Sequence, residues 1–370
     1  MRIDFKKSSV FTSHIISGSS PGNLWNLLSD NNFQIDLRYL PKLLLALPII
    51  LLNIPFIGLE KLLFSKKIRN TVVKQPIFII GYPRSGTTYL MYLMSKDQQF
   101  AFCRMFECMG PHVIFTFGKV LRGIAKMVLP KKRPMDNLEL GADLPKEEEF
   151  ALGNMSVASM ANALYFPKRF STYFDRFVLF NGNDQDKSSF KVNMNWLFKK
   201  LTLKNNGKRL LLKSPFNTGR IKLLLEMYPD AKFIHIHRHP HKVFASNEKL
   251  YESVIPQVAF HTVSDAEMER HIFYTYHQTM ERYFHDSSLL QNNQLFEMSY
   301  DDFISNPISI FKKMYSQLEI ENFASALPLI EKEVAGYKNY KANIHNDDEG
   351  KRDRVYKELS GIYEKLGYSK

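Results

Sequence analysis

The chain has 370 residues, of which 45% are hydrophobic and 24% are charged, which excludes a disordered, collagen-like or multi-span membrane protein. Lys and Arg number 50 against 37 Asp and Glu, and the formal net charge of +13 favours an anionic partner. That partner is nucleic acid, an acidic membrane surface or a phosphorylated small molecule. The only cysteines are Cys103 and Cys108, which excludes a disulfide framework and favours a reducing, cytoplasmic compartment. No Cys or His cluster has the spacing of metal ligands, so no metal is expected.

The N-terminal 73 residues contain an apolar segment but no pattern of a cleaved secretory signal. Between Lys42 and Glu60 no residue is charged, and two prolines and Asn53 interrupt the run. A helix that spans a membrane needs about 20 apolar residues, with about 17 as the lower limit. Residues 43–59 therefore have three interpretations: a buried arm, a segment lying in a lipid interface, or a span. The interruptions place the span last, and we expect the protein to contact a membrane peripherally if the interfacial interpretation holds.

After residue 73 short apolar runs alternate with helical patterns, which is typical of a parallel α/β sheet. Strands are expected at 76–81, 208–213, 232–237 and 295–298, and helices at 86–96, 220–228, 240–251, 300–318 and 352–366. The stretch 100–206 is less regular and rich in Phe, Tyr and Met, so we expect a helical cap inserted over the sheet. The sequence thus predicts an N-terminal segment, 1–73, and one domain, 74–370, with a P-loop-like parallel sheet flanked by helices.

The most informative segment is a glycine turn between the first strand and the first helix of this domain. It runs from Gly81 to Thr88 with the sequence Gly-Tyr-Pro-Arg-Ser-Gly-Thr-Thr. The backbone N–H groups of such a turn and the positive end of the helix dipole form a cradle for an anion. The glycines have P-loop spacing, but a nucleotide triphosphatase needs Lys where Thr87 stands. The fixed cation is Arg84, whose guanidinium can bind an oxyanion through two parallel hydrogen bonds without a metal.

A second candidate anion site follows the strand at 232–237. Arg238 ends this strand, and Ser246 lies near the start of the next helix. In open α/β sheets ligands bind at the carboxyl ends of the strands, where both residues are expected. An arginine at a strand end can also simply cap the sheet. The second motif therefore indicates an anion site only in combination with the first.

With both motifs in this order, the chain resembles the sulfotransferases that use 3′-phosphoadenosine 5′-phosphosulfate (PAPS), in a broad, largely bacterial branch. The resemblance covers roughly residues 74–368. It implies that one set of residues holds the 5′-phosphosulfate and another holds the 3′-phosphate. The first set is Arg84, Ser85, Gly86, Thr87 and Thr88, and the second is Arg238 and Ser246. It also implies in-line transfer of the sulfuryl group to a hydroxyl of a small acceptor, with PAP as product.

The same resemblance implies a lysine near the sulfuryl group and a general base. Lys213 matches the lysine because it ends the comparable strand. The usual histidine is absent from that strand, and Asn217 stands at one of its positions. Glu107 is the first candidate base, because other branches draw a glutamate from this region, and His112 is the second. Glu148 is the third, since burial can raise the pKa of a carboxylate, although a run of three Glu is more often a solvated helix face.

Residues 100–180 are dense in Phe, Met and Tyr, which favours a lipophilic acceptor such as a sterol-like or lipid alcohol; roughly half of these side chains are expected in the cap's own core. The resemblance to this family also implies that Lys338 and Lys341 lie in a late loop that closes over the nucleotide.

Two other function classes remain open at this point. A P-loop-like nucleotide kinase or NTPase would need the lysine that is missing at Thr87 and acidic ligands for magnesium. A non-catalytic membrane-surface protein with a degenerate anion loop would explain the charge and the apolar segment. Nucleic-acid binding is disfavoured, because the basic residues are scattered and not clustered with aromatics.

Overall fold

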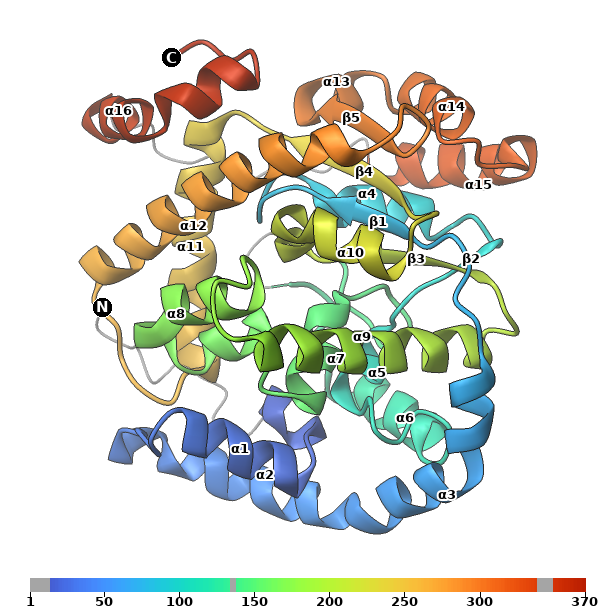
Figure 1. Ribbon diagram of the computed structural model, residues 1–370, viewed down its shortest axis with the longest axis vertical. Helices are drawn as coiled ribbons and strands as arrows, with labels where there is room; N and C mark the ends of the chain where they lie inside the picture. The colour runs from blue at the N-terminus through green and yellow to red at the C-terminus, as the bar shows by residue number, and fades with distance from the viewer. Residues whose placement is uncertain (1–13, 134–137, 338–348) are drawn as a thin grey trace. The chain divides into compact units, whose positions relative to one another are not determined.

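The computed structural model describes residues 14–133, 138–337 and 349–370, and it divides into two compact units. Unit 1 comprises the described residues within Met1–Val73, Cys103–Gly207 and Lys249–His271. Unit 2 comprises those within Lys74–Phe102, Lys208–Glu248 and Ile272–Lys370. Unit 1 is mainly helical, and unit 2 contains the sheet (Figure 1). The division of the chain into an N-terminal segment, a domain and a cap stays a prediction.

The sheet of unit 2 has five parallel strands, among the described residues, in the order β2-β3-β1-β4-β5 (Figure 1). They are β1 (Ile77–Ile80), β2 (Phe100–Ala101), β3 (Arg209–Lys213), β4 (Lys232–His237) and β5 (Leu295–Ser299). The register places Ile79 beside Lys213 and Ile80 beside His235, so β3 and β4 flank β1. The predicted fold class, a parallel α/β sheet flanked by helices, is therefore confirmed.

Unit 2 also contains helices between its strands and after the last strand, β5. They are α4 (Thr87–Met94), the 3-10 helix η5 (Pro215–Arg220), α10 (Ile221–Met227), α13 (Tyr300–Ser305), α14 (Pro307–Gln317), α15 (Phe323–Gly336) and α16 (Glu349–Lys365). Two further helices, α11 (Pro240–Val258) and α12 (Asp265–Asp286), have residues in both units. The single helix predicted at 300–318 is two helices, because Pro307 lacks a backbone N–H and disfavours helical geometry at Asn306. Helices α12 and α15 were not predicted.

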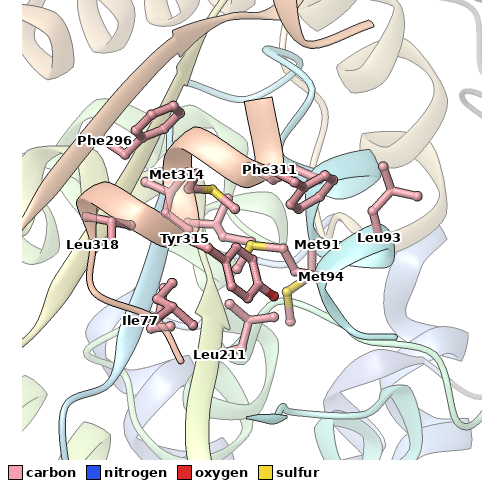
Figure 2. Packing of buried hydrophobic residues seen from close by; sticks show 14 of the residues in the cluster. Ile77, Met91, Leu93, Met94, Leu211, Phe296, Phe311, Met314, Tyr315 and Leu318 are labelled. Carbon is pink, nitrogen blue, oxygen red and sulfur yellow. The ribbon is translucent and has the colours of Figure 1, made fainter. Parts of the chain in front are cut away.

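One hydrophobic core joins the sheet to α4, α14 and α15 (Figure 2). Ile77 of β1 and Leu211 of β3 lie in it together with Met91, Phe311 and others. Successive strand residues point to opposite faces of a sheet, and Phe78 accordingly stacks on Phe233 on the other face, with ring centroids 5.5 Å apart. The central strand β1 is therefore buried on both faces, and this fixes the position of the turn that follows it.

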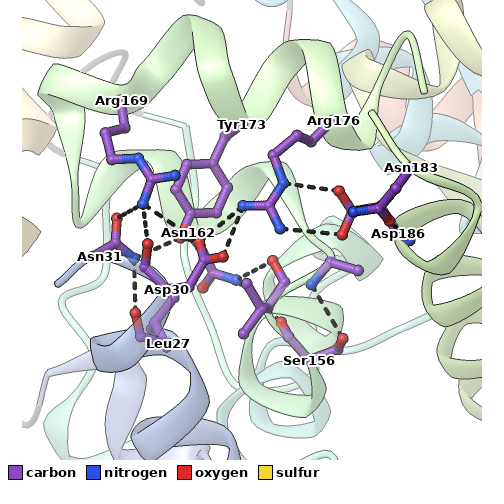
Figure 3. A network of polar contacts seen from close by, with 12 residues as sticks. Leu27, Asp30, Asn31, Ser156, Asn162, Arg169, Tyr173, Arg176, Asn183 and Asp186 are labelled. Atoms are coloured by element: carbon purple, nitrogen blue, oxygen red, sulfur yellow. Dashed lines mark hydrogen bonds and ion pairs between the residues drawn. The ribbon is translucent and has the colours of Figure 1, made fainter. Parts of the chain in front are cut away.

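Unit 1 is built from helices of the N-terminal region and of the insertion between β2 and β3. They are α1 (Pro21–Asp30), α2 (Leu40–Leu52), α3 (Ile54–Asn70), α5 (Met105–Met109), α6 (Gly118–Val128), α7 (Glu148–Met155), α8 (Phe170–Phe177) and α9 (Asp184–Lys204). Arg176 of α8 donates hydrogen bonds to Asp30 at 2.9 Å and to Asp186 at 2.8 Å (Figure 3). Asn31 donates to the Tyr173 hydroxyl at 2.7 Å. These contacts fix the end of α1 to α8 and to the first turn of α9.

No single helix among the described residues is long and apolar enough to cross a membrane. The segments Leu37–Leu52 and Ile54–Asn70 meet this test of length and composition only as a pair, with a bend of 42° at the break. Pro48 lies inside α2, Pro55 lies in the first turn of α3, and Asn53 stands between the helices. Proline removes a helical hydrogen bond, which accounts for an interrupted helix here.

Candidate active site

The glycine turn between β1 and α4 has a constrained backbone. Gly81 and Gly86 have φ values of 141° and 109°, which favour glycine. A Cβ atom on Gly81 would lie 2.2 Å from the carbonyl oxygen of Ile236, and one on Gly86 would lie 2.4 Å from the ring of Tyr300. Arg84 is also left-handed, with a φ of 74°, which non-glycine residues adopt rarely. Strained backbone of this kind clusters at ligand-binding sites, and it is stable only where the surrounding structure holds it.

The structure brings the two predicted anion motifs together at the carboxyl ends of β1 and β4. Arg84 Nε donates a hydrogen bond to Ser246 Oγ at 2.9 Å. The neighbouring Asn247 donates to the carbonyl oxygens of Pro83 at 2.8 Å and of Val243 at 2.9 Å. The turn after β1 is therefore fixed to the first part of α11 by side chains that follow the β4 motif. Asn247 was not predicted as a site residue, although it is adjacent to Ser246.

Arg238 lies beside the same turn. Its guanidinium carbon stands 4.4 Å from the ring centroid of Tyr300, the residue that begins α13 and that closely approaches Gly86. Burial raises the pKa of the Tyr300 hydroxyl, and the charges of Arg238 and Arg84 oppose that rise. One aromatic ring is thus electrostatically coupled to both arginines. Tyr300 was missed in the sequence, although its place directly after β5 puts it at the ligand-binding edge of the sheet.

Two donors in this region lack an internal partner. Within the described part of the chain, neither Ser85 Oγ nor Arg238 Nε has a hydrogen-bond partner, and both atoms are buried. Buried polar groups are paired in most proteins, so unpaired ones require an explanation such as a ligand. Unpaired donors beside a strained glycine turn fit an anion with several acceptor oxygens. The residues present therefore fit the phosphate and phosphosulfate groups of PAPS.

Lys213 approaches the turn from the other neighbouring strand. It is buried at the end of β3, and its Nζ atom donates to Thr88 Oγ1 at 3.3 Å. Thr218, in η5 directly after this strand, accepts a hydrogen bond from the backbone N–H of Gly81 at 2.8 Å. The segments after β3 and β4 thus both support the turn after β1. Thr218 was missed in the sequence, where only the missing histidine at Asn217 drew attention to this segment.

Glu107, the first candidate base, lies in unit 1 and has both carboxylate oxygens engaged. Oε2 accepts a hydrogen bond from the backbone N–H of Arg104 at 2.7 Å, which caps the start of α5. Oε1 accepts from Lys204 Nζ at 2.6 Å. The carboxylate is fully buried, so these contacts compensate a charge that water does not reach.

His112 and Glu148, the other candidate bases, also lie in unit 1. His112 Nε2 lies 3.0 Å from the carbonyl oxygen of Asn154, so Nε2 carries the proton. Burial lowers the pKa of His112 to about 4, which leaves the ring neutral and weakly basic at neutral pH. Glu148 and Glu149 begin α7 and are buried, which corrects the expectation of a solvated face for this run. Glu149 is engaged by the Met160 N–H at 2.7 Å.

Two further expectations concern the late loop and metals. Lys338 and Lys341 lie outside the described residues. Among the residues that the structure describes, no group of three or more His, Cys, Asp or Glu could hold a metal ion.

A model of the sulfotransferase family matches residues 76–325, which confirms the resemblance drawn from the two anion motifs. The omega-hydroxy-beta-dihydromenaquinone-9 sulfotransferase Stf3 of Mycobacterium bovis is 27% identical over 317 residues, covering 84% of this chain and 80% of that protein. The Mycobacterium tuberculosis protein of the same name has the same values.

Two solved structures share the fold across most of the chain. Sulfotransferase STF1 of Mycobacterium tuberculosis H37Rv has a TM-score of 0.68 at 15% identity, covering 95% of this chain and 94% of that one. Sulfotransferase STF9 of Mycobacterium avium has a TM-score of 0.67 at 18% identity, covering 85% and 82%. At these identities the likeness establishes the fold alone.

Proposed function

Because the chain belongs to the sulfotransferase family, we propose that it transfers the sulfuryl group of PAPS to a hydroxyl of a small lipophilic acceptor. The observation that carries the choice of donor is the hydrogen bond of 2.9 Å from Arg84 to Ser246. It joins a turn suited to a 5′-phosphosulfate to a motif suited to a 3′-phosphate. A single bisphosphorylated nucleotide can therefore engage both.

PAPS, when bound, supplies the sulfuryl group on a phosphate leaving group. In our proposal one set of residues holds the 5′ end of the nucleotide through guanidinium, hydroxyl and backbone N–H groups. This set is Arg84, Ser85, Gly86, Thr87 and Thr88. Arg238 and Ser246 hold the 3′-phosphate, and the Lys213 ammonium stabilises negative charge near Thr88. The residues act by positioning and electrostatics, which suits an in-line displacement, and the scheme assigns no role to a metal.

The acceptor hydroxyl must lose a proton to a base as it attacks sulfur. Glu107 remains our first candidate, but its contacts with Arg104 and Lys204 also explain its burial without catalysis. His112 is a poor proton acceptor at neutral pH, because its pKa is about 4. Glu148 is a buried carboxylate of the same unit.

Single variants separate the three candidate bases. We expect Glu107→Gln, His112→Gln or Glu148→Gln to lower kcat by about 10²–10⁴-fold only where the base is removed. PAP affinity and melting temperature should stay near the wild-type values for that variant. A variant that loses activity and melting temperature together has lost a structural residue instead.

The lipophilic acceptor in this proposal is supported by the related proteins. The related Stf3 proteins are named for a hydroxylated dihydromenaquinone. Phe166 and Phe170 of the insertion are buried in unit 1, which packing explains without an acceptor, whereas Met127 is 79% exposed. We include in the proposal a peripheral membrane contact through residues 43–59, since a lipid alcohol resides in the bilayer.

A thermal-shift series followed by an activity assay tests this function. PAP should raise the melting temperature more than ATP or NAD at equal concentration, because only PAP offers both phosphate groups. The enzyme should then transfer sulfate from PAPS to sterol or polyprenoid alcohols. No stabilisation by PAP, or an EDTA-sensitive ATP turnover, would contradict the donor. Activity on free sugars alone would contradict the lipophilic acceptor.

A further inference from the structure

The bent pair α2–α3 has one buried face that continues across the bend. Its buried residues follow each other at helical spacing: Tyr39, Leu43, Ala46, Ile50, Asn53, Ile57, Glu60 and Ile68. A buried face of this kind packs a helix against the rest of its own protein, and the opposite face of a surface helix is normally polar. Packing within unit 1 therefore explains one face of the pair and not the other.

The opposite face of the pair is apolar. Leu37, Leu52 and Leu62 are 86%, 70% and 81% exposed. Between residues 43 and 59, all of them described, every exposed residue is Leu, Ile, Pro or Gly. Monomeric soluble proteins rarely expose contiguous surface of this kind without a binding partner. We call the exposed apolar residues of 37–63 the α2–α3 apolar face.

Helix α6 adds a second exposed apolar stripe that begins beside α3. Phe117, which precedes α6, packs on Phe56 with ring centroids 4.6 Å apart. The backbone N–H of Thr116 donates to Glu60 of α3 at 3.1 Å. The stripe follows helical spacing i, i+4, i+7, i+8 and consists of Val120, Ile124, Met127 and Val128. Lys119, Arg122 and Lys126 lie on another side of this helix, so α6 is amphipathic with its apolar side exposed.

The charges between residues 37 and 70 are nearly all basic, while Asp36, directly before this stretch, pairs with Arg38 at 3.4 Å. The basic residues between 37 and 70 stand at the two ends of the α2–α3 apolar face: Arg38, Lys42, Lys61, Lys66, Lys67 and Arg69. Glu60 is the only acidic residue of this stretch, and it is buried with its carboxylate 2.5 Å from Lys200 Nζ. An apolar centre with basic ends complements a bilayer whose headgroups are anionic.

We propose that the α2–α3 apolar face, with α6, docks onto a bilayer containing anionic phospholipids, and that the helical pair lies in the plane of the interface. Protein interfaces carry about one hydrogen bond per 100–200 Å². The exposed side chains between 43 and 59 offer no hydrogen-bonding group, so acyl chains suit this face better than a protein partner. The other face of the pair is buried along its whole length, so lipid can reach one side of the pair only. The docking specifies the peripheral membrane contact named in the proposed function, and it depends on neither the sulfuryl donor nor the transfer reaction. Only access to a lipid acceptor rests on that function.

Vesicle flotation of the full-length protein tests the docking. The wild type should float with phosphatidylcholine vesicles that contain phosphatidylglycerol, and it should bind pure phosphatidylcholine vesicles less. Salt should weaken the binding to the anionic vesicles, because it screens the basic residues at the two ends of the face. Leu52→Gln combined with Leu62→Gln should lower partitioning about tenfold or more, because two leucines no longer leave water on binding. The matched control is Val192→Gln, which changes an apolar residue of α9, in the same unit, that is 65% exposed.

Several outcomes overturn the docking. The wild type fails to float with any vesicle, or Leu52→Gln/Leu62→Gln floats as well as Val192→Gln. A concentration-dependent dimer that Leu52→Gln/Leu62→Gln dissociates, without vesicle binding, assigns the face to a second copy instead. Resistance of the bound protein to alkaline carbonate extraction assigns it to a span. The proposed function is tested separately, by the stabilisation that PAP gives in the absence of lipid. The PAPS-dependent function and the membrane docking can therefore fail independently of each other.

Discussion

Arg84 combines a rarely adopted backbone conformation with a contact between distant parts of the chain. Its φ of 74° turns the backbone between the two glycines, and its side chain reaches Ser246. Asn247 fixes the preceding Pro83 carbonyl from the same helix. The left-handed conformation costs of order 1–3 kcal/mol, which the surrounding hydrogen bonds must offset. We therefore regard the strain as part of how the turn is held ready for an anion.

Replacing the arginine of the β4 motif should weaken nucleotide binding without unfolding the protein. We expect Arg238→Ala to reduce PAP affinity about 10- to 100-fold, because a hydrogen bond to a charged group contributes about 1.5–3 kcal/mol. Titration calorimetry with PAP measures the change, and Lys313→Ala, which removes an exposed cation of α14, is the control. Unchanged affinity in Arg238→Ala would remove Arg238 from the site.

A methyl group on Gly86 should abolish PAP binding. The left-handed φ of 109° is strained for alanine, and the new Cβ would lie 2.4 Å from the Tyr300 ring. Gly123→Ala in α6 is the matched control, since a Cβ there meets nothing within 4 Å. That control should keep PAP affinity and gain about 0.5–1 kcal/mol, as expected for Gly to Ala in a helix. Equal PAP affinity in both variants would show that the turn tolerates a side chain.

At the scale of the elements, a buried ion pair joins α3 to α9 within unit 1. Glu60 accepts hydrogen bonds from the backbone N–H groups of Phe115 and Thr116 and faces Lys200 of α9, and both charged side chains are 3% exposed. Burial lowers the pKa of Lys200, and the charge of Glu60 opposes that shift. Removing one partner of a buried ion pair lowers the stability of the fold, because the other charge stays buried without compensation.

Lys200→Met should therefore be strongly destabilising. We expect a loss of about 3–5 kcal/mol, because Glu60 would remain buried without its counter-ion. Removal of one partner from the exposed pair Lys365–Glu281, by Lys365→Met, should cost under about 1 kcal/mol. Urea unfolding followed by circular dichroism compares the two. Glu60→Gln combined with Lys200→Met should recover part of the loss, and equal effects of the two single variants would argue against the pair as the fastening of α3.

For the whole molecule, buried neutral histidines predict a loss of stability in acid. His14 Nε2 bonds the Val258 carbonyl at 2.7 Å, while Nδ1 accepts from the Ile16 N–H, so the ring is neutral. Burial lowers the pKa of His14 to about 4, as it does for His112. The unfolded pKa is about 6.5, so the unfolded chain binds more protons between the two values. Stability is therefore fully present above pH 6.5 and falls as the pH drops toward 4.

The size of this effect can be measured by chemical unfolding at several pH values. Each histidine should contribute about 3 kcal/mol of lost stability by pH 4 or below, from 1.36 kcal/mol per pH unit over 6.5 − 4 = 2.5. His14→Gln should flatten the dependence between pH 6.5 and 4, whatever its effect at pH 7. His285→Gln, which alters a histidine whose side chain is 77% exposed, should leave the slope unchanged. Identical slopes in all three proteins would contradict the assignment.

The strands and the glycine turn could be predicted from the sequence, because their signals are local. Strands β1, β3, β4 and β5 follow from short apolar runs, and the turn follows from the spacing of Gly81 and Gly86. The break between α13 and α14 was missed despite Pro307, since the apolar spacing continues across it. Helix α12 was missed as well.

The sequence by itself determined the fold class and the family. Both the alternation of apolar residues and the glycines that an anion-binding turn requires are patterns of residues close together in the chain. Only the tertiary structure decided what surrounds each side chain. It brought Arg84 to Ser246 across 162 positions, buried Glu148 and engaged both oxygens of Glu107. Burial and pairing depend on which distant segments pack together, and packing is a property of the folded chain that no local pattern contains.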